Sequence, residues 1–323
     1  MDIEQLRSRR EERRRTIRRR RRVASGLIAA MVAIVVAIVV LASSSGGSTA
    51  SHGAVALVKH SPATDAGRIG TAAPPASGSE PAGPPGTDPV PILMYHVIAA
   101  PPPGAPFPGL YVEPAEFAEQ MQALEHAGWH AVTLDQVEAY WRPGVPLGKG
   151  KPIVISFDNG YNSQYTQALP VLRRLGWVGD ENLQLSGLPP SQGGLGQGQI
   201  RGLLQAGWEL DTQGISHADL ITLSSEQLQY QVADARKTLQ QRYRVPVNWF
   251  CYPSGHYNPT VEAAVKAAGF TGSTTVVPGW AHPGDDPYRL HRLRVLGGTS
   301  AQALLALLDD TRDAPPAPSS YSA

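Results

Sequence analysis

The fold is decided by residues 151–161, which read KPIVISFDNGY. Residues 153–155 are a continuous β-branched run, typical of a short strand that is buried on both faces. Asp158 and Asn159 follow where that run ends, and a segment with helical spacing covers residues 161–175. In α/β architectures the carboxyl end of a buried strand is where chemistry takes place, so we expect a site here.

Strand and helix patterns alternate about seven times outward from this stretch. Strand patterns occupy residues 90–97, 130–134, 182–185, 208–212, 248–252, 270–274 and 290–296, and the clearest helical patterns occupy 113–127, 224–243 and 259–268. This alternation predicts a parallel sheet with right-handed crossovers, closed or nearly closed into a (β/α) barrel. A doubly wound open sheet is the alternative.

The net charge of +1 hides a split between the two ends of the chain. Residues 1–22 hold eleven arginines and four acidic residues, a charge of +7, whereas the remaining 301 residues hold 17 basic and 23 acidic side chains. The body is therefore mildly acidic, and we expect no nucleic-acid binding. The single cysteine, Cys251, excludes an intrachain disulfide and a cysteine-based metal cluster.

The arginine-rich residues 1–22 directly precede a segment that is long enough to cross a bilayer. Residues 23–42 are free of charge and dominated by Ala, Val, Ile and Leu. The positive flank predicts a cytoplasmic amino terminus and a single-pass cell-membrane protein whose remaining chain lies outside. A cleaved signal peptide is the alternative, although its apolar core is usually shorter, about 7–15 residues.

The composition divides the rest of the chain into three parts. Residues 43–88 are rich in Ser, Gly, Ala and Pro and predict a disordered linker. Residues 89–310 carry the strand and helix patterns and form the predicted domain. Residues 311–323 read as a loose tail.

Five motifs in order resemble those of the polysaccharide deacetylase family (the NodB-homology domain, carbohydrate esterase family 4). Residues 156–160, SFDNG, resemble the family's T-F-D-D-G. The others are Met94-Tyr95-His96, similar to M-Y-H; residues 208–220, similar to G-x-E-I-x-x-H-T-x-x-H-x-x-L; residues 250–258, similar to F-x-Y-P-x-G-x-Y-N; and residues 290–295, similar to L-x-R-x-x-V. The resemblance covers about residues 89–300.

The resemblance implies a distorted seven-stranded barrel and metal-dependent hydrolysis of an amide C–N bond in N-acetylated glycans. Asp158 matches the position of the catalytic base. The positions of the three ligands to zinc, or to a similar divalent metal, match Asn159, Gln213 and His217. In the family a bound metal polarises the acetamide carbonyl and holds the attacking water.

Two of the three ligand positions depart from the family's Asp-His-His pattern. Asn159 and Gln213 offer only neutral carbonyl oxygens, whereas zinc prefers imidazole and carboxylate. We therefore expect impaired or absent activity, with zinc bound if the protein is active and no metal otherwise. Asp211 should share a strand face with Gln213. It is either a substitute ligand or a carboxylate that bonds Gln213 or a backbone amide.

The motifs also suggest residues that contact a substrate. Tyr252 and Pro253 lie in the motif at residues 250–258. His96 and His256 are candidates for sugar contacts or for the general acid; the alternative is that each histidine is an ordinary polar residue. Cys251 reads as a small buried residue and not as a nucleophile.

Two functional hypotheses follow. The first is a deacetylase-family domain that residues 23–42 anchor in the cell membrane, with the domain on the outer side. Its substrate would be peptidoglycan or an exopolysaccharide. The second is a non-catalytic pseudoenzyme that binds a glycan or a protein partner. The metal ligands distinguish the two.

Overall fold

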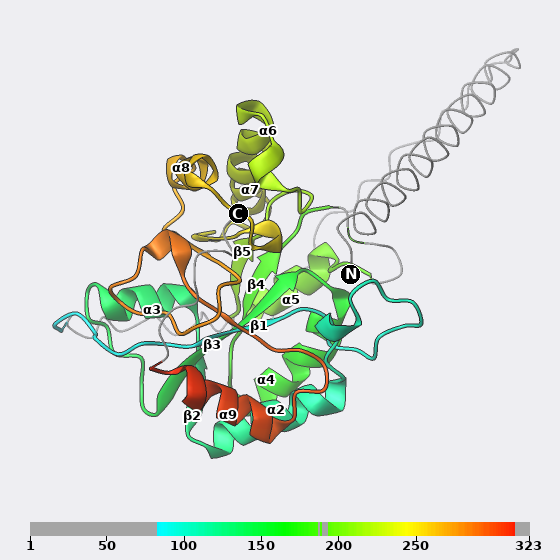
Figure 1. Cartoon of the computed structure of the whole chain (residues 1–323), viewed down its shortest axis with the longest axis vertical. Coiled ribbons are helices and arrows are strands. Elements are labelled where there is room, and N and C mark those ends of the chain that lie inside the picture. Colours follow the sequence, from blue (N-terminus) through cyan, green and yellow to red (C-terminus); the bar gives the residue numbers. More distant parts are fainter. Residues whose placement is uncertain (1–82, 187, 189–192, 314–323) are drawn as a thin grey trace, which may run out of the picture. The chain divides into compact units, whose positions relative to one another are not determined.

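A curled sheet of parallel strands forms the centre of the molecule (Figure 1). The computed structural model describes residues 83–186, 188 and 193–313. The strands are β1 (Ile92–Tyr95), β2 (Trp129–Val132), β3 (Lys151–Asn159), β4 (Asp180–Leu183), β5 (Glu209–Thr212), β6 (Trp249–Cys251), β7 (Gly272–Thr274) and β8 (Leu293–Arg294). Seven of them follow the order β7-β6-β5-β4-β3-β1-β8. This order lacks the reversal of a doubly wound sheet, and the observed fold is a curled, partly closed form of the predicted (β/α) barrel.

The longest strand, β3, organises the sheet as its sequence predicts. Its second half pairs with β4, and its middle pairs with β1. Its first half pairs with β2, which branches from the continuous order and makes an eighth strand among the described residues. The expected count of seven strands is therefore corrected to eight, because β2 joins β3 only through residues 151–154.

The segment that contains β8 nearly closes the curl into a barrel. Leu290 forms an isolated parallel bridge with Thr274 at the end of β7. Three residues later, Leu293 pairs with Leu93 of β1. Residues 290–294 thus connect the two edges of the sheet and carry Arg292 across its interior.

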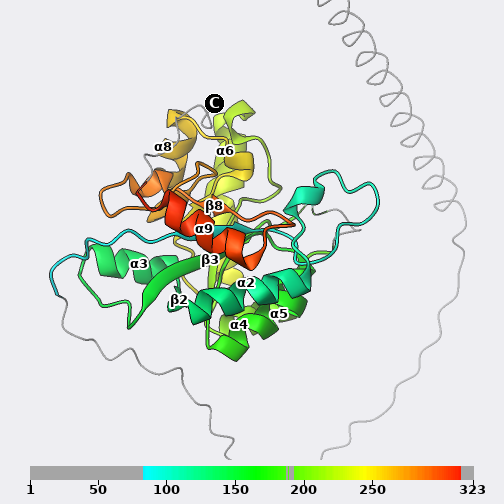
Figure 2. The ribbon, with the colours of Figure 1, turned by 60° about the horizontal axis from the view of Figure 1, so that its bottom comes forward.

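Helices cover the outer face of the sheet (Figures 1 and 2). They are α2 (Pro114–His126), α3 (Leu134–Trp141), α4 (Leu169–Leu175), α5 (Gln197–Gln205), α6 (Ser225–Gln229), α7 (Ala235–Tyr243), α8 (Pro259–Ala267) and α9 (Ala301–Thr311). The helix expected over 224–243 is present as α6 and α7, joined by a π-helical turn at Tyr230–Asp234. The Ser224 hydroxyl accepts a hydrogen bond from the Gln227 N–H and caps α6, a contact typically worth ~1 kcal/mol.

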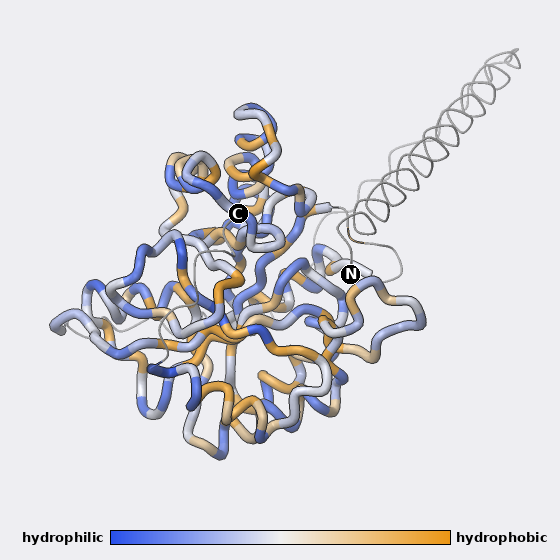
Figure 3. The backbone as a smooth tube through the Cα atoms, viewed as in Figure 1, coloured by the Kyte–Doolittle hydropathy of each residue, from blue (hydrophilic) through white to orange (hydrophobic). Residues whose placement is uncertain are grey.

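Alternation along β3 separates an apolar outer layer from a polar interior. Phe157 points outward, where its ring stacks on Trp208 at a centroid distance of 4.9 Å. Its neighbours Ser156 and Asp158 point inward and are fully buried. Hydrophobic residues run along the central strands, whereas hydrophobic and hydrophilic residues alternate in the surrounding helices and loops (Figure 3). The interior face of the sheet at the carboxyl end of β3 therefore carries polar side chains that can take part in chemistry.

The predicted segments at residues 1–22 and 23–42 lie outside the described residues, as do most of the predicted linker and tail. Within the part of the chain that the structure describes, no helix has the length and apolar character needed to span a membrane.

Candidate functional site

A cavity of about 490 Å³ opens at the carboxyl ends of the strands. Six of the nine residues predicted for the site line it: His96, Asp158, Asn159, Gln213, His217 and Tyr252. They come from the ends of β1, β3, β5 and β6, because parallel strands end on one side of the sheet. Phe107, Leu110, Tyr111 and Tyr161 add an apolar and aromatic wall.

Asp158 is held in the floor of the cavity by a buried ion pair. The Arg292 guanidinium donates from Nη1 to Asp158 Oδ1 at 2.7 Å and from Nη2 to Oδ2 at 2.9 Å. Asn182 Nδ2 also donates to Oδ1, at 3.0 Å. Burial alone would raise the pKa of Asp158, but the charge and hydrogen bonds of Arg292, together with His96 and the Asn182 hydrogen bond, outweigh burial and hold that pKa well below its usual value. Asp158 is therefore ionised at neutral pH.

His96 faces this ion pair from the end of β1. Its Nε2 lies 3.9 Å from Asp158 Oδ2, and its Nδ1 is buried without a hydrogen-bond partner. Burial, followed in the same direction by the charge of Arg292, outweighs the attraction of Asp158 and lowers the pKa of His96 to about 4. The imidazole is therefore neutral at pH 7 and can exchange a proton at the cavity wall.

The end of β3 is fixed by a buried amide. Gln164 Nε2 donates to the backbone carbonyl of His96 at 2.9 Å and to that of Asp158 at 2.8 Å. One side chain thus ties the ends of β1 and β3 together, which sets the spacing between His96 and Asp158.

The three ligand positions lie around the same cavity but carry amides. Asn159 adopts a φ of 80°, and its Nδ2 donates to Gln184 Oε1 at 3.2 Å. Gln213 is buried, and its Oε1 has no hydrogen-bond partner. His217 has a φ of 52°, and burial lowers its pKa, so that it offers a neutral imidazole.

This donor set does not fit the zinc site that the family resemblance implies. It consists of one imidazole and two neutral carboxamides, without an anionic ligand. Within the described residues, the His, Cys, Asp and Glu side chains that converge closely enough to hold an ion are Asp180, Glu209 and Asp211. None of these three lines the cavity.

The structure does not bring Asp211 into the cavity as a substitute ligand. Its Oδ1 accepts a hydrogen bond from the Trp249 backbone N–H at 2.9 Å, and its carboxylate faces Asp180 and Glu209. Positions two residues apart along a strand are separated by ~6.8 Å. Asp211 and Gln213 therefore share a face of the strand, but Asp211 lies deeper in the sheet interior and Gln213 at the cavity. The alternative of a bond to a backbone amide is the correct one.

Two of the residues expected to contact substrate also lie away from the cavity. Pro253 begins a buried turn at Pro253–Gly255, and the cavity wall is formed by its neighbours Tyr252 and Ser254. His256 does not line the cavity; its Nδ1 lies 3.1 Å from Asp219 Oδ1. The motif that contains both residues therefore serves mainly to shape the turn after β6.

The roles of Arg292 and of Gln184 are not apparent from the sequence motifs. Arg292 was seen only as part of a motif, yet its side chain is fully buried and also donates from Nη2 to Cys251 Sγ at 3.2 Å. The available signal was an arginine inside an apolar strand pattern, which requires a buried acidic partner. Burial raises the pKa of the Cys251 thiol to about 12, which agrees with its expected structural role.

Comparison with solved structures finds other proteins with a similar fold. A deacetylase from Streptococcus pyogenes, PplD in complex with acetate, superimposes with a TM-score of 0.63 at 24% identity, over 71% of this chain and 100% of that structure. At this identity the match shows the fold alone.

Sequence comparison then supplies the family. The polysaccharide deacetylase family model matches residues 147–273. The Bacillus subtilis protein YxkH, provisionally described as a polysaccharide deacetylase, is 27% identical over 223 residues, which cover 69% of this chain and 77% of YxkH. The chain is therefore similar to the polysaccharide deacetylase family over its central part.

A short segment also resembles an enzyme with a known glycan. Over 66 residues the chain is 35% identical to the poly-β-1,6-N-acetyl-D-glucosamine N-deacetylase of Escherichia coli. The match covers 20% of this chain and only 10% of that enzyme.

Proposed function

We propose that this domain binds N-acetylated cell-envelope glycans in the cavity and that its amide hydrolysis is strongly impaired. The observation that carries the proposal is the set Asn159, Gln213 and His217 around one cavity, in which the positions that should hold a cation offer neutral oxygens. The partner class is suggested by the Escherichia coli relative, whose substrate is an N-acetylated glucosamine polymer.

The retained residues suit binding better than chemistry. Asp158 is ionised, but both of its oxygens accept hydrogen bonds from Arg292, so its lone pairs are largely committed. Neutral His96, the Gln213 carboxamide and the Asn159 carboxamide present polar groups without net charge. Such groups match the hydroxyl and acetamide groups of a neutral sugar, and Tyr161 and Tyr252 add apolar surface.

Binding and hydrolysis are tested separately on the purified full chain. Calorimetry measures binding of peptidoglycan fragments and of a β-1,6-linked N-acetylglucosamine oligomer, and an enzymatic assay measures acetate release with zinc present. We expect binding of at least one glycan and little or no acetate release. If neither glycan binds, the glycan assignment is wrong; if the native chain holds about one zinc and releases acetate efficiently, the assignment of impaired hydrolysis is wrong.

A restoration variant tests the reason for the impairment. Asn159→Asp with Gln213→His recreates the family's ligand set and should raise zinc affinity and acetate release by at least ~10-fold. Mutation of a residue that only hydrogen-bonds a metal ligand typically changes metal affinity or activity by about 10–100-fold, so a change of the ligands themselves should have at least this effect. Asn258→Asp with Gln241→His makes the same chemical changes outside the cavity and should gain neither. An unchanged zinc affinity in the first variant would overturn the ligand assignment.

The proposal includes a location at the outer face of the cell membrane. The support is the uncharged stretch 23–42 next to the arginine-rich residues 1–22. Protease treatment of intact cells should digest the domain if it faces outward, whereas protection until lysis would refute that orientation.

A further inference from the structure

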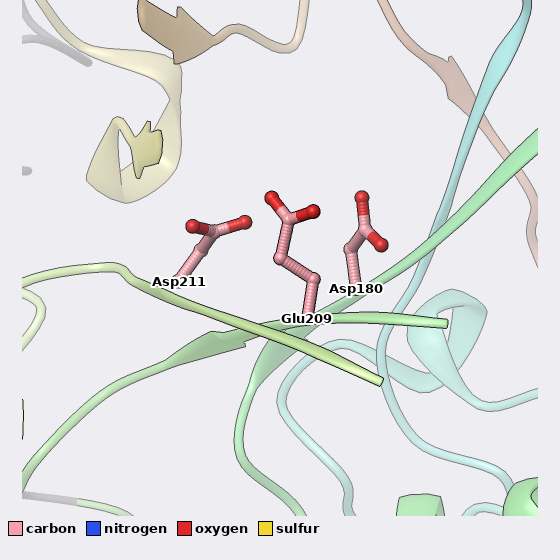
Figure 4. Close-up of side chains that lie close together, drawn as sticks. All are labelled: Asp180, Glu209 and Asp211. Carbon is pink, nitrogen blue, oxygen red and sulfur yellow. The ribbon is translucent and has the colours of Figure 1, made fainter. Parts of the chain in front are cut away.

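A second group of convergent side chains lies on the interior face of the sheet at the amino ends of β4 and β5. The side chains of Asp180, Glu209 and Asp211 stand side by side, with their carboxylates next to one another (Figure 4). One carboxylate oxygen from each lies within 4.8 Å of those of the other two. The cluster is separate from the proposed glycan site, because none of the three residues lines the cavity.

The backbone holds each carboxylate in place through one oxygen. Asp180 Oδ2 accepts from the Leu134 N–H at 2.9 Å, and Glu209 Oε2 accepts from the Asp135 N–H at 3.0 Å. Both N–H groups belong to the first turn of α3. Asp211 Oδ1 accepts from the Trp249 N–H at 2.9 Å. The orientation of the cluster is therefore set by α3 and β6.

The other oxygen of each carboxylate accepts no hydrogen bond while the three groups are ionised, although the Glu209 and Asp211 carboxyls lie within hydrogen-bonding reach of each other. Asp180 Oδ1, Glu209 Oε1 and Asp211 Oδ2 are all buried, and Asp180 and Asp211 are 0% exposed. Among the described residues no Lys, Arg or His forms an ion pair with any of the three. Buried carboxylates without a compensating charge are costly, so three of them side by side indicate a missing cation or bound protons.

The nearby Asp135 does not supply that compensation. Its two oxygens accept hydrogen bonds from Asn248 Nδ2 at 2.8 Å and from Trp249 Nε1 at 3.0 Å. It adds negative charge beside the cluster and strengthens the need for a cation.

We propose that Asp180, Glu209 and Asp211 bind a hard divalent cation, calcium or magnesium, through their three unpartnered oxygens. An all-oxygen ligand set suits these ions, whereas zinc favours imidazole and thiolate. Oxygens up to 4.8 Å apart fit around one ion at the ~2.3–2.6 Å bond length of calcium. The ion would join β4, β5 and the start of α3, which makes it structural and independent of the glycan site.

Without a cation the cluster favours the protonated forms of its carboxyl groups. Burial, reinforced by the neighbouring carboxylates, raises the pKa of Asp180 and of Asp211 well above the ordinary value. Burial and the charge of Asp135 raise the pKa of Glu209 to about 7. A cation would remove this cost, since it favours the ionised form of each group.

The test is cation binding by the full chain after treatment with a chelator. Calorimetry with calcium and with magnesium should show about one ion per chain, and the melting temperature should rise with the concentration of the tighter-binding ion. Asp180→Asn keeps an oxygen to accept the Leu134 N–H but removes the charge, so it should weaken binding by at least ~10-fold. Asp309→Asn, on the exposed side of α9, is the matched control and should bind like the native chain.

The sign of the stability change separates a cation from protons. Without metal, Asp180→Asn should melt at or above the native temperature, because a neutral amide replaces a carboxyl group that is costly to ionise when buried. With excess calcium or magnesium it should melt below the native chain. Glu209→Gln serves if the first variant does not fold. No binding of either ion to the native chain, or a native affinity in both variants, overturns the proposal and leaves protons as the compensating charge.

Discussion

Replacing Arg292 with methionine should cost much of the stability of the domain. The guanidinium is fully buried and donates two short hydrogen bonds to Asp158, whose side chain is only 2% exposed. Arg292→Met therefore leaves a carboxylate buried without its counter-charge. Breaking a buried ion pair in this way typically costs about 3–5 kcal/mol. For a domain of this size that corresponds to a fall in melting temperature of ~6–20 °C.

Urea denaturation at pH 7.5 measures the loss, and two further variants show its cause. Arg142→Met breaks the surface ion pair between Arg142 and Glu138. The Arg142 side chain is 61% exposed, so this variant should lower the free energy of unfolding by less than about 1 kcal/mol. Asp158→Asn combined with Arg292→Met removes both charges and should recover a large part of the loss, because no buried charge then stands alone. If Arg292→Met costs no more than Arg142→Met, the ion pair does not stabilise the fold and our reasoning about the cavity floor is wrong.

Two other expectations concern acid stability and the cavity mouth. The pKa of His96 is about 4 in the folded chain and near 6.5 when unfolded, so the unfolded chain binds an extra proton between these values and stability falls as pH drops through that window. Between pH 7.5 and 4.5 the free energy of unfolding, measured by urea titration, should fall by about 2–3 kcal/mol less in His96→Gln than in the native chain. An identical fall in the variant and in the native chain would contradict this. Phe107 lines the cavity yet is 69% exposed, so Phe107→Ala should weaken glycan binding by about 2- to 10-fold. Tyr230→Ala removes an exposed ring outside the cavity and should not weaken binding. Equal affinities of Phe107→Ala and the native chain would show that the Phe107 ring does not touch the sugar.

The sequence was informative where a local pattern determines the structure. The β-branched run before Asp158 gave β3, and Pro114 gave the start of α2, because strand burial and helix initiation depend on near neighbours. The capped helix after Ser224 follows the same logic. These elements required no knowledge of distant contacts.

The sequence was less informative where the answer depends on depth or on distant residues. Asp211 and Gln213 share a strand face, and only the three-dimensional structure shows that one lies toward the amino ends of the strands and the other at the cavity. The pairing of Asp158 with Arg292 joins residues 134 positions apart. A periodic pattern carries no information about such a pair.

That separation also sets the order in which the domain is completed during synthesis. At ~5–20 residues per second, a ribosome takes about 7–27 s to make the 134 residues between the acid and its partner. During that interval β3 exists without the arginine that lets Asp158 be buried. The same C-terminal segment also joins the two edges of the sheet. Completion of the cavity and closure of the barrel are therefore one late event, and a chain that ends before residue 292 can achieve neither.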